Sequence, residues 1–170
     1  QHRLMTIAPI AAIILAAGKG TRMKSSRHKV LHPVGGRPMV EHVMATLDTL
    51  NPARRVVVVG SERDQVEAQI GDRATFVVQE PQHGTGHAVQ QAAPALADFA
   101  GDAAVLYGDV PLITADTLRR MIDARTHADL VVLGFRAADP AAYGRLKLSA
   151  DGGLEAIVEF KDASPEERRI

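Results

Sequence analysis

The chain has 170 residues, of which 46% are hydrophobic and 24% are charged, so it can bury one substantial core and is not a disordered protein. Its 20 basic and 20 acidic residues cancel, which argues against nucleic acid or an anionic membrane as the main partner. The lack of cysteine excludes disulfides, thiolate metal sites and cysteine nucleophiles, and it suits a cytoplasmic protein.

The N-terminal region holds the one candidate targeting segment of the sequence. The apolar run Met5–Ala17 follows basic residues as a signal peptide would, but the same run is typical of a buried first strand, which we prefer. No apolar stretch is long enough to span a bilayer. We expect residues 1–8 to be a flexible start or a cloning remnant, and one domain to occupy residues 9–170.

Strands and helices are predicted to alternate along most of the chain. The apolar run from Ile10 to Leu15 predicts a strand covered on both faces, and helical spacing predicts a helix from Met39 to Leu50 with Pro38 in its first turn. Further strands are predicted at Val56–Val59, Thr75–Val78, Ala103–Tyr107 and Leu130–Phe135, and further helices at Glu62–Ile70, His87–Leu96 and after a Thr114 cap. This alternation predicts an α/β fold with a Rossmann-like, doubly wound, mostly parallel sheet.

The C-terminal part does not continue the alternation of strands and helices. Arg145–Leu148 and Leu154–Glu159 flank a turn with two glycines and predict a hairpin. Ser164–Ile170 predicts a loop and the start of a helix, with nothing that would close a fold. We therefore expect the domain to be incomplete at its C-terminus.

The first predicted strand leads into a glycine-rich loop, Gly18-Lys19-Gly20-Thr21-Arg22. Parallel sheets bind ligands at the carboxyl ends of their strands, and this loop offers open backbone N–H groups, a hydroxyl and two cations to a phosphate chain. It is not a Walker loop, and Met23 stands where a dinucleotide fingerprint needs its third glycine. The loop alone leaves a simple tight turn open as an alternative.

Further basic residues follow this loop. Lys29 is the one that we expect to reach the same polyphosphate, whereas Lys24, Arg27 and Arg37 are expected to face water, as most surface cations do.

The segment Gln79–His87 contains a strand end, a turn and a helix start. The Gln79 side chain can pair with a base edge because its amide offers both a donor and an acceptor. His83 and His87 have a metal-binding spacing, but two glycines between them argue against a helix that presents both rings, so we reject a metal site there. The alternative is that Gly84 and Gly86 only shape the turn.

Asp109 lies just past a predicted buried strand and should face the ligand crevice. One carboxylate together with nucleotide phosphates is a usual way to hold Mg²⁺. By itself the residue could equally be a turn or helix cap, and the glycine-rich loop is what favours the metal.

The order and spacing of these motifs closely resemble the sugar nucleotidyltransferase family. The residues that carry this resemblance are Leu15–Met23, Lys29–Leu31 and Tyr107–Pro111. Gln79–Gly86, Tyr143–Arg145 and Ile157–Ser164 are similar to the bacterial N-acetylglucosamine-1-phosphate uridyltransferases, and the likeness spans about residues 9 to 170. It implies a nucleotide-diphospho-sugar transferase fold.

The resemblance also implies a reaction and a site. UTP and N-acetylglucosamine 1-phosphate would give UDP-N-acetylglucosamine, for cell-wall and lipopolysaccharide precursors, and pyrophosphate. Arg22, Lys29 and Asp109 would be catalytic, with Asp109 holding the Mg²⁺ cofactor, and Gln79 and Gly84 would read uracil. The implied substrate-binding residues are Leu15, Ala16, Ala17, Gly18, Gly20, Thr21, Lys29, Gln79, Gln82, Gly84, Thr85, Gly86, Tyr107, Gly144 and Glu159, of which Gly144 and Glu159 would contact the amino sugar.

In this family an acetyltransferase β-helix of hexapeptide repeats follows the uridyltransferase domain, and no such repeat occurs here. The resemblance implies a homotrimer for the complete protein, whereas we expect this part alone to be a monomer. One departure is that Arg27-His28-Lys29 replaces the family's Leu-Pro-Lys, which keeps the lysine but removes the rigidity of proline.

Alternatives from other classes stay open on the sequence. The same phosphate machinery would serve a pyrophosphorylase for another base or sugar, and this part could bind a nucleotide without turnover. A Rossmann dehydrogenase is disfavoured by Met23.

Overall fold

The computed structural model describes residues 8–18 and 24–170. The chain divides into two compact units, Gln1–His127 and Ala128–Ile170, and each is described by itself. Within the described residues, no helix is both long enough and apolar enough to cross a membrane.

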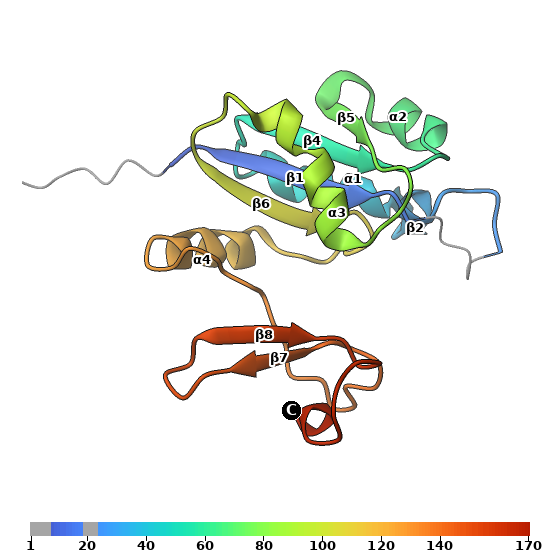
Figure 1. Ribbon diagram of the computed structural model, residues 1–170. Helices are drawn as coiled ribbons and strands as arrows, with labels where there is room; N and C mark the ends of the chain where they lie inside the picture. The colour runs from blue at the N-terminus through green and yellow to red at the C-terminus, as the bar shows by residue number, and fades with distance from the viewer. Residues whose placement is uncertain (1–7, 19–23) are drawn as a thin grey trace, which may run out of the picture. The chain divides into compact units, whose positions relative to one another are not determined.

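The first unit is built on one parallel sheet. Its strands are β1 (Ile10–Ala16), β4 (Arg54–Val59), β5 (Thr75–Val78) and β6 (Asp102–Tyr107). They are hydrogen-bonded in the order β5-β4-β1-β6, and every neighbouring pair is parallel. The strand order therefore reverses beside β1, and the carboxyl ends of β1 and β6 lie next to each other (Figure 1). A ligand crevice is expected at such a reversal.

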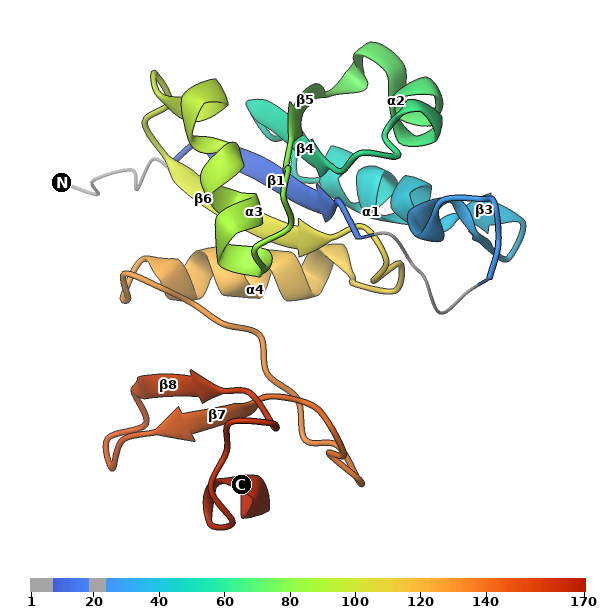
Figure 2. The same ribbon diagram turned by 45° about the vertical axis from the view of Figure 1, so that its right-hand side comes forward.

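Helices cover both faces of this sheet, as the doubly wound prediction requires. The helices are α1 (Met39–Asp48), α2 (Asp64–Ile70), α3 (Thr85–Gln91) and α4 (Ala115–Arg125). Side chains of α1, α2 and α4 share one buried cluster, and side chains of α3 belong to another. In Figure 2, α3 lies in front of the sheet and α1 lies behind it. The predicted α/β architecture is confirmed.

The two-residue period of β4 explains how one strand serves both clusters. Val57 and Val59 pack with α1 and α2, whereas Val56 and Val58 pack with α3, because successive side chains of a strand point to opposite faces. All four valines are at most 1% exposed. A continuous apolar run is thus the correct pattern for this central strand.

Short elements complete the first unit. They are the antiparallel pair β2 (Pro33–Val34) and β3 (Arg37–Pro38), and the 3₁₀ turns η2 (Lys29–Leu31), η3 (Gly71–Arg73) and η4 (Ala93–Leu96).

Two predicted helix ends can be compared with the structure. The predicted helix His87–Leu96 is instead α3 followed by η4, since Pro94 has no N–H to continue the α-helical bonding. The predicted Thr114 cap is confirmed, because its hydroxyl accepts a hydrogen bond from the Thr117 backbone N–H at 3.2 Å.

The second unit contains the predicted hairpin. Strands β7 (Arg145–Leu148) and β8 (Leu154–Val158) pair antiparallel, and η5 (Glu167–Arg169) follows them. Arg145 is 4% exposed, and its guanidinium donates to the carbonyl oxygens of Ala141, Tyr143 and Arg168. The buried Arg145 side chain therefore connects the segment before β7 with η5, which follows β8.

The prediction of a buried strand at Leu130–Phe135 is wrong. These residues form no strand, and the side chains of Leu130 and Phe135 are each 70% exposed. A strand needs a neighbour for its backbone groups, and in this unit, all of which the structure describes, β7 and β8 pair only with each other. Apolar character alone could not supply that neighbour.

An ion pair with a buried carboxylate connects α1 to η3, the turn that follows α2. Glu41 on α1 is 7% exposed, and its carboxylate accepts hydrogen bonds from Arg73 at 2.5 and 3.0 Å and from Gln69 at 2.9 Å. The hydrogen bond from Arg73 is the main cause that holds the pKa of Glu41 below its ordinary value, against the opposing effect of burial.

Replacing this carboxylate should cost stability in a pH-dependent way. Because the pKa of Glu41 is lower in the folded chain, its contribution is full above the unfolded pKa and is lost as the pH falls through the folded pKa. We expect Glu41→Gln to lower the free energy of unfolding by about 1–3 kcal/mol at pH 7. Urea unfolding of both proteins should show this difference shrinking below about pH 4. A difference that stays constant into acid would contradict the charge-based account.

Candidate functional site

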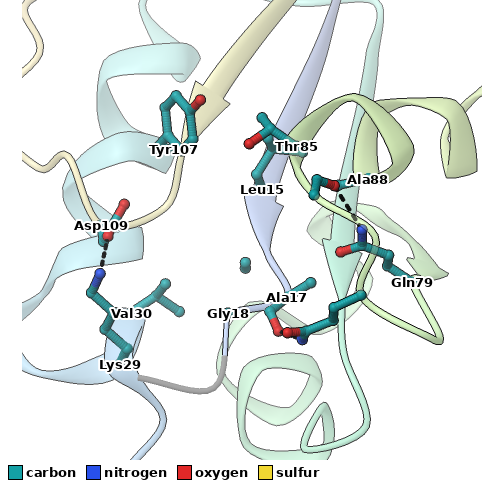
Figure 3. A pocket seen from close by; sticks show the side chains of 13 residues that line it. Leu15, Ala17, Gly18, Lys29, Val30, Gln79, Thr85, Ala88, Tyr107 and Asp109 are labelled. Atoms are coloured by element: carbon teal, nitrogen blue, oxygen red, sulfur yellow. Dashed lines mark hydrogen bonds and ion pairs between the residues drawn. The ribbon is translucent and has the colours of Figure 1, made fainter. Parts of the chain in front are cut away.

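A cavity of about 360 Å³ lies at the carboxyl ends of β1 and β6, beside the first turn of α3 (Figure 3). It is where the strand order reverses, so topology places it at the expected position. Eleven residues that the sequence predicted for the site line this cavity: Leu15, Ala16, Ala17, Gly18, Lys29, Gln79, Gln82, Gly84, Thr85, Tyr107 and Asp109.

The other predicted residues have different positions. Gly20, Thr21 and Arg22 lie outside the described residues. Gly86 is in the first turn of α3 but is not part of the cavity wall. Gly144 and Glu159 belong to the second unit, where a Cβ built on Gly144 would lie 4.0 Å from a Glu159 carboxylate oxygen. Their predicted role in binding an amino sugar stays a prediction.

The cavity wall includes two residues that the sequence prediction missed. Val30 is 3% exposed and follows Lys29 within η2, and Ala88 is 4% exposed on the inner side of α3. Val30 is adjacent to the predicted Lys29. For Ala88 the available signal was its helical spacing of four residues from Gly84.

The carboxyl end of β1 is held by residues from distant parts of the chain. The Gln82 amide nitrogen donates to the Ala17 carbonyl oxygen, and the Gly108 N–H donates to the Leu15 carbonyl oxygen at 2.9 Å. Gly60, at the end of β4, leaves the space for this arrangement. A Cβ built on it would lie 2.7 Å from the Ala17 carbonyl oxygen and 3.0 Å from the Gln82 amide nitrogen.

Lys29 and Asp109 form an ion pair at one end of the cavity (Figure 3). Lys29 comes from η2 and Asp109 from the turn after β6. Their side chains are 40% and 28% exposed, so the pair lies in contact with solvent. The opposite charges of Lys29 and Asp109 offset each other in this pair.

The segment before Lys29 is held by hydrogen bonds from α2. The His28 backbone N–H donates to Gln65 Oε1 at 2.9 Å, and Gln65 Nε2 donates to the Ser26 carbonyl oxygen at 2.8 Å. A proline at position 28 would have no N–H for the first of these bonds. The bond from Gln65 thus restrains the backbone at the place where this sequence departs from the family pattern.

The His28 side chain also belongs to this support. It is 5% exposed, and its Nδ1 accepts a hydrogen bond from the Val30 backbone N–H at 3.4 Å. Burial lowers the pKa of His28, although the nearby Glu62 carboxylate acts in the opposite direction. A neutral ring is the state that can accept this bond.

Gln79 and Gly84 lie at the other end of the cavity. Gln79 is only 4% exposed, and its side-chain amide nitrogen donates a hydrogen bond to the Gly84 carbonyl oxygen at 2.9 Å. Gly84 has a φ of 96°, a backbone conformation that L side chains rarely adopt. The turn between β5 and α3 therefore requires glycine there.

The described residues contain no group of three or more His, Cys, Asp or Glu side chains that could hold a metal ion. Asp109 is the carboxylate of the cavity. Mg²⁺ commonly uses one or two carboxylates plus phosphate oxygens, so this donor set fits a metal that arrives with a nucleotide.

Comparison with known proteins identifies the family. A family model described as a MobA-like NTP transferase domain matches residues 12–160. The chain belongs to this family. It is 55% identical to the bifunctional protein GlmU of Rhizorhabdus wittichii over 98% of this chain and 58% identical to that of a Ruegeria species over 94% of it. The chain spans only 38% and 36% of the length of these two proteins.

Solved structures share the fold. HddC from Yersinia pseudotuberculosis, complexed with GMP-PN, is 25% identical with a TM-score of 0.69, over 88% of this chain and 68% of that one. A putative glucose-1-phosphate thymidylyltransferase from Bacillus anthracis is 26% identical with a TM-score of 0.69, over 88% of this chain and 64% of that one. The parallel sheet of the first unit is thus a nucleotidyltransferase sheet.

The tight packing at Gly60 gives a testable consequence. Gly60→Ala should lower the free energy of unfolding by about 1–3 kcal/mol, because the new Cβ would push against a backbone oxygen that cannot move alone. Gly86→Ala is the matched control, since a Cβ there meets nothing within 4 Å and alanine favours a helix. Urea unfolding of the three proteins measures both effects, and equal stabilities for Gly60→Ala and wild type would refute the packing argument.

Proposed function

We propose that the chain is the uridyltransferase part of an enzyme that converts UTP and N-acetylglucosamine 1-phosphate into UDP-N-acetylglucosamine and pyrophosphate. The observation that carries the proposal is the layout of the cavity, in which an amide and a glycine turn face one end and the Lys29–Asp109 pair faces the other (Figure 3). A base and a polyphosphate would occupy these two ends. The similarity to GlmU proteins supports the choice of uracil and of the amino sugar.

The reaction needs positioning and charge neutralisation rather than a base. A phosphate oxygen of the sugar phosphate attacks the α-phosphorus of UTP in line, a new P–O bond forms, and the bond to the β-phosphate oxygen breaks as pyrophosphate leaves. The attacking phosphate is already ionised at neutral pH, so no proton has to be removed. This chemistry suits a cavity whose ionised groups are a lysine and an aspartate.

In this proposal Lys29 neutralises charge on the triphosphate and Asp109 would hold Mg²⁺. The bound metal would supply further neutralisation of the phosphates. The two side chains pair with each other, and an ion pair this exposed contributes only about 0–1 kcal/mol. Exchanging that partner for a phosphate or a metal therefore costs little. Arg22 would add a second cation from the glycine-rich loop.

The proposal extends to the complete protein through the same relatives. We propose that it is a cytoplasmic, bifunctional homotrimer that also acetylates glucosamine 1-phosphate and supplies cell-wall and lipopolysaccharide precursors. The alternative within the class is a transferase for another base, since the structural relatives include a complex with GMP-PN and a putative thymidylyltransferase.

A pyrophosphate-release assay tests the substrate. The full-length gene product is incubated with N-acetylglucosamine 1-phosphate and, separately, UTP, CTP, GTP or dTTP, and glucose 1-phosphate replaces the amino sugar as a control. We expect the highest kcat/KM with UTP and the amino sugar, and weak or no activity for residues 1–170 alone. A preference for another nucleotide would show that the proposed base, uracil, is wrong. Nucleotide binding without turnover by the full-length product would favour a binding module.

Removing either member of the ion pair should reduce turnover. In the full-length enzyme, Lys29→Ala and Asp109→Ala should each lower kcat/KM by at least about a hundredfold, the scale of losing one charge-stabilising contact. Steady-state kinetics with UTP would show it. Arg27→Ala is the matched control, because this exposed cation is absent from the cavity wall and should leave kcat/KM close to wild type. Near-normal turnover in Lys29→Ala or Asp109→Ala would refute their assignment.

A further inference from the structure

His87 contacts the amide that faces the base end of the cavity. Its Nδ1 lies 3.1 Å from Gln79 Nε2, the same nitrogen that donates to the Gly84 carbonyl oxygen at 2.9 Å. A carbonyl oxygen can only accept, so the contact with Gly84 identifies this end of the amide as the nitrogen. Its second hydrogen is then available to His87 Nδ1, which must carry no proton in order to accept it.

The other end of the amide is thereby fixed as an acceptor. Gln79 Oε1 has no hydrogen-bond partner in the part of the chain that the structure describes, and it points into the cavity (Figure 3). The Gly84 backbone N–H, on the same wall, likewise has no partner among the described residues. Gln79 and Gly84 thus leave one acceptor and one donor without a partner among the described residues at this end of the cavity.

This pattern matches one pyrimidine and not the other. Uracil presents the N3–H donor beside the O4 acceptor, whereas cytosine presents an acceptor at N3 beside a donor at N4, which is the reverse. Unpaired polar groups in a closed site are costly, so a wall of fixed polarity can discriminate between the two bases. A free Gln79 side chain could turn its amide and weaken the discrimination.

We propose that His87 is the positioning residue that sets base specificity, because it accepts a hydrogen bond from Gln79 and so keeps Gln79 Oε1, rather than Nε2, directed at the nucleobase. This rests on the proposed function, which assigns a uridine nucleotide to the cavity. His87 itself is not part of the cavity wall and acts through Gln79.

The second contact of His87 is compatible with this role. Gln91 Nε2 lies 3.2 Å from His87 Nε2 and 3.1 Å from the His87 carbonyl oxygen. The contact with a carbonyl oxygen makes Gln91 Nε2 a donor as well, and a neutral imidazole accepts at only one nitrogen, so Gln79 and Gln91 compete for the ring. The proposal requires Nδ1 to accept from Gln79, with the proton on Nε2 and the Gln91 amide moved away from Nε2. Gln91 is less buried than Gln79, so solvent can satisfy its displaced nitrogen at lower cost.

The tautomer of His87 is a direct test that needs no variant. Nitrogen NMR of the ¹⁵N-labelled chain distinguishes a protonated ring nitrogen from an unprotonated one. We expect His87 Nδ1 to be unprotonated and Nε2 to carry the hydrogen at neutral pH. A ring with its proton on Nδ1 overturns the proposal.

The functional test is the ratio of kcat/KM for UTP to kcat/KM for CTP in the full-length enzyme. His87→Phe keeps a ring without an acceptor and should lower this ratio by about tenfold or more, the scale of one buried hydrogen bond. His87→Asn keeps an acceptor near the position of Nδ1 and should restore most of the ratio. His83→Phe is the matched control, since its ring packs on His87 at 5.2 Å without contacting Gln79.

The outcomes separate this proposal from the proposed function. A wild-type enzyme without preference for UTP over CTP overturns the proposed base and this inference with it. A wild-type preference that His87→Phe retains in full overturns the inference alone. Equal losses with UTP and CTP in folded His87→Phe also overturn it, because they show a structural role without an effect on specificity.

Discussion

The cavity depends on β1 lying between two parallel strands and ending where their chains diverge. Its last backbone groups are held from three directions: Gly108 binds the Leu15 carbonyl oxygen, Gln82 binds the Ala17 carbonyl oxygen, and Gly60 packs against that same oxygen. None of these contacts is local in sequence. The strand end at which the predicted phosphate loop begins is therefore fixed by the sheet and by contacts from distant parts of the chain.

Two ion pairs in this unit differ in how firmly their carboxylate is held. Glu41 on α1 is buried and accepts hydrogen bonds from both Arg73 of η3 and Gln69 of α2, so this pair is a structural connection even though Arg73 is partly exposed. Lys29 and Asp109 are partly exposed and have no such support among the described residues. Breaking a weak ion pair costs little free energy, so each of its side chains is available to a ligand. An overall neutral protein can thus keep a cation and an anion side by side in one cavity.

The sequence predicted the sheet well because its strands are continuous apolar runs. Such a run can be recognised without knowing which helix packs on which face of the sheet. The same pattern failed at Leu130–Phe135, since it reports apolar character but not whether a partner strand exists. Motif spacing brought most cavity residues together correctly, because parallel strands bring their carboxyl ends to one edge. It could not reveal side-chain contacts across the fold, such as Gln82 with Ala17 or Gln65 with the backbone of His28, because these depend on rotamers and packing rather than on period.

The two ends of the cavity come from separate pieces of chain, and this has a consequence for specificity. Lys29 and Asp109 come from η2 and the turn after β6, while Gln79, Gly84 and His87 come from β5 and the start of α3. Charge on a triphosphate is the same for every base, so in the proposed function the first set would not distinguish between nucleotides. Recognition of the base would then rest on the polarity of the Gln79 amide, which its hydrogen-bond partners set. In that proposal, changes confined to the β5–α3 segment would alter the base that is selected and leave the phosphate chemistry intact. The structural relatives agree with this, since one is a complex with GMP-PN and another is named a putative thymidylyltransferase.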